Sequence, residues 1–213
     1  MNNSMKNSKK IDHNLLSSLK DVSNNELKGN WNNEYFNNQY PIVLDLGCGN
    51  GDYIIALSEL YSDKNFIGID NDRDLIFHGA KKVFEGEMFN AAFINADLKQ
   101  LDDYFDNEEV DEIWITFPEF EDYGKDLISI NFLKLFFKLL KPDSAIHFKT
   151  DNSDFFEIAY DAFAAEGYRP VEKISDIHNS NINDYLINLK TPKELICVNT
   201  NQPVHYFRFI CDK

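Results

Sequence analysis

Strand-like and helix-like stretches alternate along the chain after Pro41, and this alternation constrains the fold more than any other feature. Five short apolar runs occur in succession, and four of them are followed by amphipathic runs with helical spacing. Because parallel strands need a crossover, usually a helix, this order predicts a doubly wound, mostly parallel α/β sheet with helices on both faces. The predicted strands are 42–46, 65–70, 91–97, 111–117, 145–151, 168–177 and 204–210.

The helices predicted between these strands cover four amphipathic runs, and the third run is expected to stop before Pro142. No helix is predicted between the last two strands. We therefore expect these two strands to be added at one edge of the sheet in antiparallel orientation. The predicted helices are 51–61, 73–84, 131–141 and 153–167.

The first forty residues differ from the rest in being rich in Asn, Lys and Ser. They predict a partly flexible N-terminal arm over 1–40, followed by one domain over 41–213, the size expected for 213 residues. Within the arm, 11–22 has the spacing of a short amphipathic helix. Residues 26–36 are expected to be ordered and anchored by three aromatic side chains, Trp31, Tyr35 and Phe36.

Composition argues against a membrane-spanning, secreted or disulfide-stabilised protein. No apolar run reaches the length of about 18 residues that a membrane span needs, and the polar start lacks the apolar stretch of a secretory signal. The three cysteines, Cys48, Cys197 and Cys211, are odd in number and scattered, which argues against a disulfide framework or a zinc site. This pattern predicts a protein of the reducing cytoplasm.

A glycine-rich loop directly follows the first predicted strand and opens the next helix. Gly47, Gly49 and Gly51 form a G-x-G-x-G pattern, which permits tight turns and a close backbone approach to a ligand. No Lys-Ser/Thr pair follows, so the pattern is not a P-loop. Asp45, at the end of the strand, would repel a pyrophosphate but attract a ligand that carries an ammonium or sulfonium group.

Two further acids close the next two strands. Asp70 ends strand 65–70, where a carboxylate can accept hydrogen bonds from ribose hydroxyls. Asp97 ends strand 91–97, where it can accept one from an adenine amino group. Because the carboxyl ends of parallel strands meet at one sheet edge, these acids and Asp45 together favour S-adenosylmethionine over a dinucleotide. Taken singly, each acid has a plainer interpretation as a solvated loop residue or a helix cap.

This arrangement resembles the class I S-adenosylmethionine-dependent methyltransferases over about 41–213. The resemblance rests on D-x-G-x-G-x-G, on the acid that closes the second strand, and on the A-D pair after the third. It implies a Rossmann-like, seven-stranded sheet whose last strand is antiparallel, with S-adenosylhomocysteine as product and no metal. The residues it assigns to cofactor binding are Asp45, Gly47, Gly49, Gly51, Asp70, Ala96 and Asp97.

Further stretches that occur in one order narrow the match: PIVLDLGCGNGDY, NFIGID, EIWITFPE, FLKLFFKLLKP, IHFKTDN and the T-x-x-E of Thr191–Glu194. With LKGNW at 27–31, they resemble the bacterial tRNA guanine-N7 methyltransferase family over about 26–210. The resemblance implies methyl transfer to N7 of a guanine in tRNA, with Glu119 in the place of the family's catalytic Asp. The residues assigned to substrate binding are Lys125, Asp151, Thr191 and Glu194.

Each of these residues also has a plainer interpretation. Glu119 can be an exposed loop acid, Asp151 can cap the helix that starts near Ser153, and Thr191 can be merely the residue before Pro192. Three more side chains near the motifs are interpreted as structural rather than catalytic: His147 within a strand, and Phe117 and Phe120 as parts of the core or its rim.

The loop after the fourth strand departs from the family pattern. The family has P-D-P followed by several basic residues, whereas here the sequence is PEFEDYGKDLISI over 118–130. Residues 118–126 hold four acids and one Lys, Lys125, so they sum to −3. The whole chain carries a net charge of −15, and affinity for a polyanion depends largely on neutralised phosphates. The acidic loop and the net charge are therefore expected to weaken tRNA binding.

Two alternatives to an active tRNA methyltransferase follow from this loop: a catalytically weakened relative that serves as a binding module, or a methyltransferase for a non-RNA acceptor. Acids between 102 and 112 are expected at the opposite edge of the sheet, away from the ligand. The arm's lysines are a possible source of phosphate contacts: Lys6, Lys9, Lys10, Lys20 and Lys28. The sequence leaves open the target guanine, the set of tRNAs, and whether the chain is a monomer or a homodimer.

Overall fold

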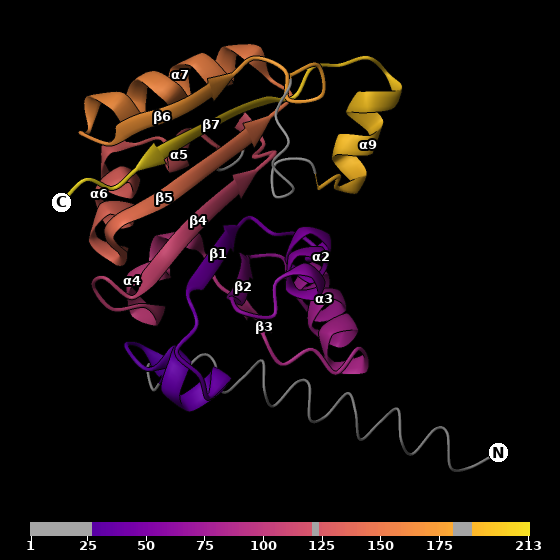
Figure 1. The fold of residues 1–213 in the computed structure, drawn as a ribbon, viewed down its shortest axis with the longest axis vertical. Helices are drawn as coiled ribbons and strands as arrows, with labels where there is room; N and C mark the ends of the chain where they lie inside the picture. The colour runs from indigo at the N-terminus through magenta and orange to yellow at the C-terminus, as the bar shows by residue number, and fades with distance from the viewer. Residues whose placement is uncertain (1–26, 121–123, 181–188) are drawn as a thin grey trace.

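The computed structural model describes residues 27–120, 124–180 and 189–213. They form a seven-stranded sheet in the order β3-β2-β1-β4-β5-β7-β6, flanked by helices (Figure 1). Strands β1 to β5 are parallel to one another, and β7 is antiparallel to both β5 and β6, so the predicted fold class is confirmed. The strands are β1 (Ile42–Leu46), β2 (Asn65–Asp70), β3 (Ala91–Asn95), β4 (Val110–Thr116), β5 (Leu140–Thr150), β6 (Arg169–Ile174) and β7 (His205–Ile210).

The antiparallel pairing predicted for the last two strands at this edge is confirmed, since β6 is antiparallel to β7. Because β7 lies between β5 and β6, β6 runs in the same direction as β5. The prediction that no helix lies between these two strands is wrong, because α9 (Pro192–Asn199) follows β6 and precedes β7. Thr191 caps this helix by accepting a hydrogen bond from the Glu194 N–H, and Pro192 occupies its first turn, where no N–H is needed.

Strand β5 is longer than predicted. The preceding helix, α6 (Ile130–Leu139), ends three residues before Pro142, and the strand begins at Leu140. The register between β4 and β5 shifts between Val110 and Glu112, so Pro142 falls in the irregular part of the ladder. A proline is tolerated there because the interrupted ladder does not require its missing N–H.

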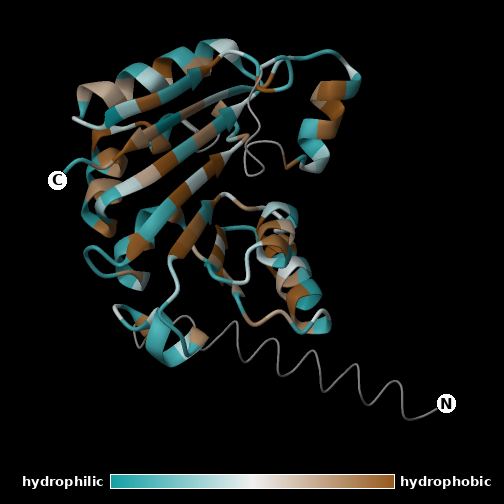
Figure 2. Cartoon of the chain, viewed as in Figure 1, coloured by the Kyte–Doolittle hydropathy of each residue, from teal (hydrophilic) through white to brown (hydrophobic). Residues whose placement is uncertain are grey.

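Helices cover both faces of the sheet and divide the core into two clusters. Residues of α2, α3 and α9 pack on one face, and residues of α4, α6 and α7 pack on the other. In Figure 2 hydrophobic residues follow β1 and β4 through the middle of the sheet. No helix among the described residues is long and apolar enough to cross a membrane. The other helical elements are α2 (Asp52–Leu60), α3 (Arg73–Glu85), η3 (Leu98–Gln100), α4 (Leu101–Tyr104), α5 (Lys125–Leu127) and α7 (Ser153–Ala165).

The ordered part of the arm packs against the domain through a short π-helical turn, η2 (Trp31–Phe36). Trp31 is fully buried, stacks on Phe105 at 5.6 Å between ring centroids, and donates its indole N–H to the Tyr104 carbonyl. Trp31 and Phe36 therefore act as the predicted anchors, whereas Tyr35 is 41% exposed. The predicted helix 11–22 and the rest of the arm before residue 27 lie outside the described residues, so the helix, the flexibility predicted for the arm and a boundary at residue 40 stay predictions.

The acids that precede and begin β4 lie at the amino-terminal end of the strand, opposite the predicted ligand edge. Glu109 accepts hydrogen bonds from the backbone N–H groups of Gly29 and Trp31. Glu112 pairs with Lys64, with 2.8 Å between the charged atoms. These acids therefore fix the arm and the sheet edge in place.

Candidate functional site

The glycine loop joins β1 to α2 at the carboxyl edge of the sheet. Gly47, Gly49 and Gly51 all have positive φ angles, of 75°, 55° and 74°. This left-handed conformation is strained for residues with a Cβ atom, so the turn requires glycine at these positions. A Cβ atom on Gly49 would meet nothing within 4 Å, which leaves the loop open to a ligand there.

Gly51 has a packing role that the sequence did not reveal. A Cβ atom on Gly51 would lie 2.2 Å from the ring of Phe93. Phe93 also lies so close to Gly68 and Gly79 that a Cβ atom on either would come within 2.8 Å of its ring. The ring of Phe93 thus fits against three glycines, which sets the position of the loop relative to β2 and α3.

Asp45 lies beneath this loop and is buried, and neither of its carboxylate oxygens has a hydrogen-bond partner among the described residues. Burial raises the pKa of Asp45 to about 7; the side chain of Thr116, which lies nearby without meeting hydrogen-bond geometry, opposes the rise, and the charge of Asp70 adds to it. A buried carboxylate without partners is unfavourable in a protein interior. The residue therefore fits a site for a ligand that brings a positive charge or N–H donors.

Asp70 and Asp97, at the ends of the next two strands, both accept hydrogen bonds from backbone N–H groups. Asp70 accepts hydrogen bonds from the backbone N–H groups of Gly49 and Asp72, each at 2.9 Å. One oxygen of Asp97 caps η3 by accepting a hydrogen bond from the Lys99 N–H, and the residue also lines the cavity described below, so its role in cofactor binding stays a prediction. Ala96 is buried and donates its N–H to the Asp70 carbonyl, which joins the ends of β2 and β3.

A cavity of about 410 Å³, here called the strand-end cavity, opens beside these residues. It brings together three of the predicted cofactor-binding residues, Gly47, Asp70 and Asp97. Its volume lies in the range of small-molecule sites, about 300–1,000 Å³. The full lining is Gly47, Asp70, Asn71, Asp97, Leu98, Lys99, Asp126, Leu127 and Phe132.

The second half of the site begins where β4 ends. Phe117 has a φ angle of 51°, which is rare for a bulky residue, and its N–H donates to the Lys149 carbonyl of β5. Strained backbone of this kind is found at functional sites. Glu119 follows after the buried Pro118 and is exposed. Lys125, on α5, places its ammonium 4.6 Å from the centroid of the Phe120 ring.

Asp151 follows directly after β5 and faces α9. Its carboxylate pairs with Lys193 at 3.1 Å and accepts a hydrogen bond from the Gln202 amide at 3.3 Å. The helix α7 is capped by Asn152, so the interpretation of Asp151 as that cap is wrong. The pKa of Lys193 is raised, mainly by Asp151 and to a smaller extent by Glu119. Asp151, Lys193 and Gln202 therefore form one polar group, the Asp151–Lys193–Gln202 cluster.

Glu194 lies below this cluster and is fully buried. It pairs with Lys149 of β5, which is also fully buried, at 3.0 and 3.2 Å between the ammonium and the two carboxylate oxygens. Burial lowers the pKa of Lys149, and the charge and hydrogen bonds of Glu194 oppose this shift. The pair fastens α9 to the sheet, and α9 carries Lys193 and the cap residue Thr191.

His147 has the structural role that was expected of it. It is buried, stacks on Trp114 with 4.0 Å between ring centroids, and places Nδ1 2.8 Å from the Tyr206 hydroxyl. Its Nε2 lies 3.4 Å from Glu112. Burial alone would raise the pKa of Glu112, but His147 and Lys64 lower it below its usual range. Phe117 and Phe120 are half-buried and pack against the two core clusters.

Several residues of the site were not predicted from the sequence. Lys149 carried a usable signal, because strand alternation places it on the same face as His147. Lys193 carried none, since its contact with Asp151 depends on the unpredicted helix α9. Lys99 and Asp126, which form an ion pair at 2.8 Å on the cavity wall, also had no local signal. Among the described residues, no group of three metal-ligating side chains is close enough to hold a metal ion.

Comparison with known sequences gives a consistent result. A family model described as "Putative methyltransferase" matches residues 39–206. The tRNA (guanine-N(7)-)-methyltransferase of Christiangramia forsetii is 33% identical, with 96% of this chain and 94% of that protein aligned. The enzyme of the same name from Bacteroides thetaiotaomicron is 36% identical over 188 residues, which are 86% of this chain and 74% of that protein.

Comparison with solved structures supports the fold. The 16S rRNA methyltransferase KamB superposes with a TM-score of 0.68 at 14% identity, covering 87% of this chain and 95% of that one. A structure described as an antibiotic-related methyltransferase gives a TM-score of 0.60 at 19% identity, covering 84% of this chain and 90% of that one. At these identities the likeness concerns the fold alone.

Proposed function

Because this chain belongs to the methyltransferase family that includes the tRNA (guanine-N(7)-)-methyltransferases, we propose that it transfers a methyl group from S-adenosylmethionine to N7 of a guanine in tRNA. The strongest structural support is the buried Asp45 carboxylate, which has no hydrogen-bond partner among the described residues and lies beneath the glycine loop. A donor with a cationic amino acid end would supply the missing partner.

The residues around the strand-end cavity suit the rest of such a donor. Asp70 is placed to accept from ribose hydroxyls, and Asp97 from the adenine amino group. Leu98, Leu127 and Phe132 provide apolar wall for a flat purine. When bound, the donor supplies an electrophilic methyl group on a positively charged sulfur, and the protein's task is to hold and orient it.

The acceptor side needs no general base. Guanine N7 is already a lone-pair acceptor on the major-groove edge, so no proton must leave before it reacts. The remaining tasks are alignment and electrostatic stabilisation of the positive charge that the purine gains. We assign the second task to Glu119, which is exposed at the carboxyl end of β4, and the recognition of guanine N–H groups to Asp151. Thr191 and Lys125 are proposed to contact the substrate from α9 and α5.

Glu194 is proposed to act differently from the other substrate-binding residues. Its side chain is 0% exposed and pairs with Lys149, so in this arrangement it holds α9 rather than presenting a free carboxylate. Its contribution to substrate binding would then pass through the position of Thr191 and Lys193 on the same helix.

The N-terminal arm is proposed to contribute phosphate contacts that the acidic loop lacks. Of its five lysines, Lys28 is within the described residues, where it donates to the Asp102 carbonyl near the edge opposite the cavity. The proposal therefore depends on the other four: Lys6, Lys9, Lys10 and Lys20. Deleting residues 1–25 should weaken tRNA binding and reduce its salt dependence. The cytoplasmic location is likewise a proposal, and the three free cysteines support it.

The deciding experiment is methylation of an unmodified tRNA transcript with labelled donor, followed by digestion and identification of the labelled nucleoside. We expect one N7-methylguanosine per responsive tRNA. A matched transcript made with 7-deazaguanine, which lacks the N7 lone pair, should remain unlabelled.

Two other outcomes would contradict the proposal in different ways. Binding of S-adenosylhomocysteine without methylation of any tRNA at low salt would favour a binding module. Labelling that persists in the 7-deazaguanine transcript would show that another atom accepts the methyl group. The acidic sequence over 118–126 is the feature that makes both outcomes worth testing.

A further inference from the structure

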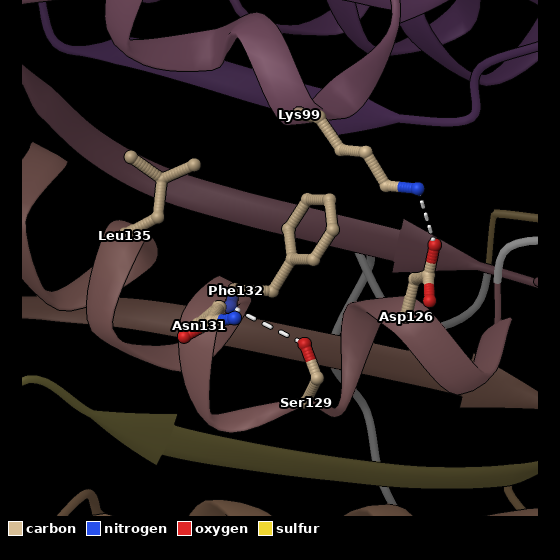
Figure 3. Close-up of a pocket in the computed structure, with 6 residues that line it drawn as sticks. All are labelled: Lys99, Asp126, Ser129, Asn131, Phe132 and Leu135. Carbon is tan, nitrogen blue, oxygen red and sulfur yellow. Dashed lines mark hydrogen bonds and ion pairs between the residues drawn. The ribbon is translucent and has the colours of Figure 1, made fainter.

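A second cavity of about 290 Å³, here called the Phe132 cavity, adjoins the strand-end cavity. The two share three lining residues, Lys99, Asp126 and Phe132. In the view of Figure 3 the Phe132 ring lies between Leu135 on one side and the Lys99–Asp126 ion pair on the other. The complete lining of the Phe132 cavity is Lys99, Asp126, Ser129, Asn131, Phe132 and Leu135.

The shared wall is at the purine end of the proposed donor. The strand-end cavity is polar near Gly47 and Asp70 and apolar near Leu98 and Phe132. A flat purine therefore fits the apolar end, and its amino group would face Asp97. Asp97 lines the strand-end cavity and Lys99, two residues later, lines both cavities, so the wall between them lies beside the Asp97 end of the proposed purine site.

The wall itself can open at small energetic cost. The ammonium of Lys99 lies 2.8 Å from the Asp126 carboxylate, but the side chains are 63% and 51% exposed. Ion pairs this exposed contribute about 0–1 kcal/mol, so a ligand can displace one. Phe132, in contrast, is buried in the core cluster and offers a fixed aromatic surface to both cavities.

We propose that the Phe132 cavity is a subsite for a substituent on the adenine amino nitrogen of the donor or its product. This inference rests on the proposed donor and goes beyond it, because it predicts binding of N6-substituted adenosyl ligands. An amino group with one substituent keeps one N–H for Asp97. An aromatic substituent would then pack against Phe132 and Leu135.

The test compares S-adenosylhomocysteine with its N6-benzyl derivative by calorimetry. We expect the wild-type protein to bind the two within about tenfold of each other. Asn131→Trp, at an exposed position of the cavity wall, should fill the cavity and weaken binding of the benzyl derivative by at least about tenfold, with no change for S-adenosylhomocysteine. Leu135→Trp is a second filling variant, and Leu60→Trp, at an exposed leucine on α2, is the matched control.

The outcomes separate this inference from the proposed function. Weakening of the benzyl derivative in both filling variants but not in the control would support the subsite. Exclusion of that derivative by a wild-type protein that binds S-adenosylhomocysteine would overturn the subsite alone, as would equal binding by the filled variants. Failure to bind S-adenosylhomocysteine at all would overturn the donor assignment, and the subsite with it.

Discussion

The two sides of the site are built in different ways. On the donor side, at the ends of β1, β2 and β3, the acids interact with nearby backbone, and Asp45 is left without a partner among the described residues. On the acceptor side, at the ends of β4 and β5, Asp151 and Glu194 are paired with lysines. The carboxylate of the donor side is therefore buried without a partner among the described residues, whereas the carboxylates of the acceptor side are already neutralised by lysines.

This difference affects how much each side must rearrange when its ligand binds. A preformed carboxylate that lacks a partner favours a cationic ligand without rearrangement of the protein. If Asp151 binds guanine as proposed, it must first release Lys193, which would then be available to a phosphate of the same substrate. On this proposal the acceptor side would couple recognition of a base to recognition of the backbone beside it.

The largest effect is expected from the buried pair on the acceptor side. Lys149→Met leaves Glu194 charged and buried, and removing one partner of such a pair destabilises a protein by about 3–5 kcal/mol. Chemical denaturation should show this loss in the free energy of unfolding. Lys149→Met combined with Glu194→Leu should recover most of it, because no charge is then left buried.

A matched control uses an exposed pair. Lys138 lies 3.7 Å from Asp102 with both side chains about half exposed, so Lys138→Met should change stability by less than about 1 kcal/mol. Equal losses of unfolding free energy in Lys138→Met and Lys149→Met would contradict the claim that burial makes the Lys149–Glu194 pair more important for stability than the exposed pair.

The next effect concerns the donor side. Asp45→Asn removes the charge that the donor's cationic end would meet, and loss of one partner of a buried charge pair weakens binding by about 2–5 kcal/mol. Calorimetry with S-adenosylhomocysteine should therefore show an increase in Kd of at least about 30-fold. Unchanged affinity would mean that Asp45 does not contact the donor.

The same variant should be more stable than the wild type, with a defined pH dependence. Burial raises the pKa of Asp45 from 3.8 to about 7, so at intermediate pH the folded protein holds a proton that the unfolded chain releases. The stability that protonation gives is fully present below about pH 4 and lost as pH rises through about 7. Thermal unfolding should show the advantage of Asp45→Asn growing over that interval and then levelling off.

The donor side could be predicted from the sequence because it is local. Asp45, the glycine loop and the ends of β2 and β3 follow from strand–turn–helix patterns a few residues long, and topology alone brings the three strand ends together. The expectation that Asp70 and Asp97 lie together at this edge is confirmed by the cavity that both residues line. The Phe93 contact with Gly51 was missed because it joins residues far apart in the chain.

The residues of the acceptor side could be predicted only from the resemblance of the sequence to the tRNA guanine-N7 methyltransferase family. Lys149 and Glu194 are 45 residues apart, and their pairing depends on α9, a helix that begins with Thr191 and Pro192 and was not recognised. The wall formed by Lys99 and Asp126 likewise joins two separate segments. Periodicity and spacing do not predict such long-range ion pairs. In the sequence, each of these charged residues looks the same as an ordinary exposed residue.

A kinetic effect, separate from stability and donor binding, is expected from the proposed catalytic acid. Glu119→Ala should lower kcat for tRNA methylation by about 100-fold, the size typical of losing one electrostatic or aligning group, with donor affinity unchanged. Single-turnover kinetics with saturating tRNA would measure it. Glu119→Gln separates the two roles, since it keeps the hydrogen-bond acceptor and loses the charge. A kcat close to wild type for both variants would remove Glu119 from the mechanism.

The smallest effect is expected from replacing Lys193, and it tests whether this lysine leaves Asp151 when tRNA binds. Lys193 is half exposed and holds Asp151 in the free protein, so it contributes little to stability. If guanine displaces it toward a phosphate, Lys193→Met should weaken tRNA binding only a few-fold but reduce the slope of log Kd against log salt by roughly 0.7–0.9. Filter binding over a salt series measures that slope, with Lys173→Met, whose lysine pairs with Glu157 on α7, as the control. An unchanged slope for Lys193→Met would mean that this lysine stays on Asp151 in the complex, and the acceptor side would then be as preformed as the donor side.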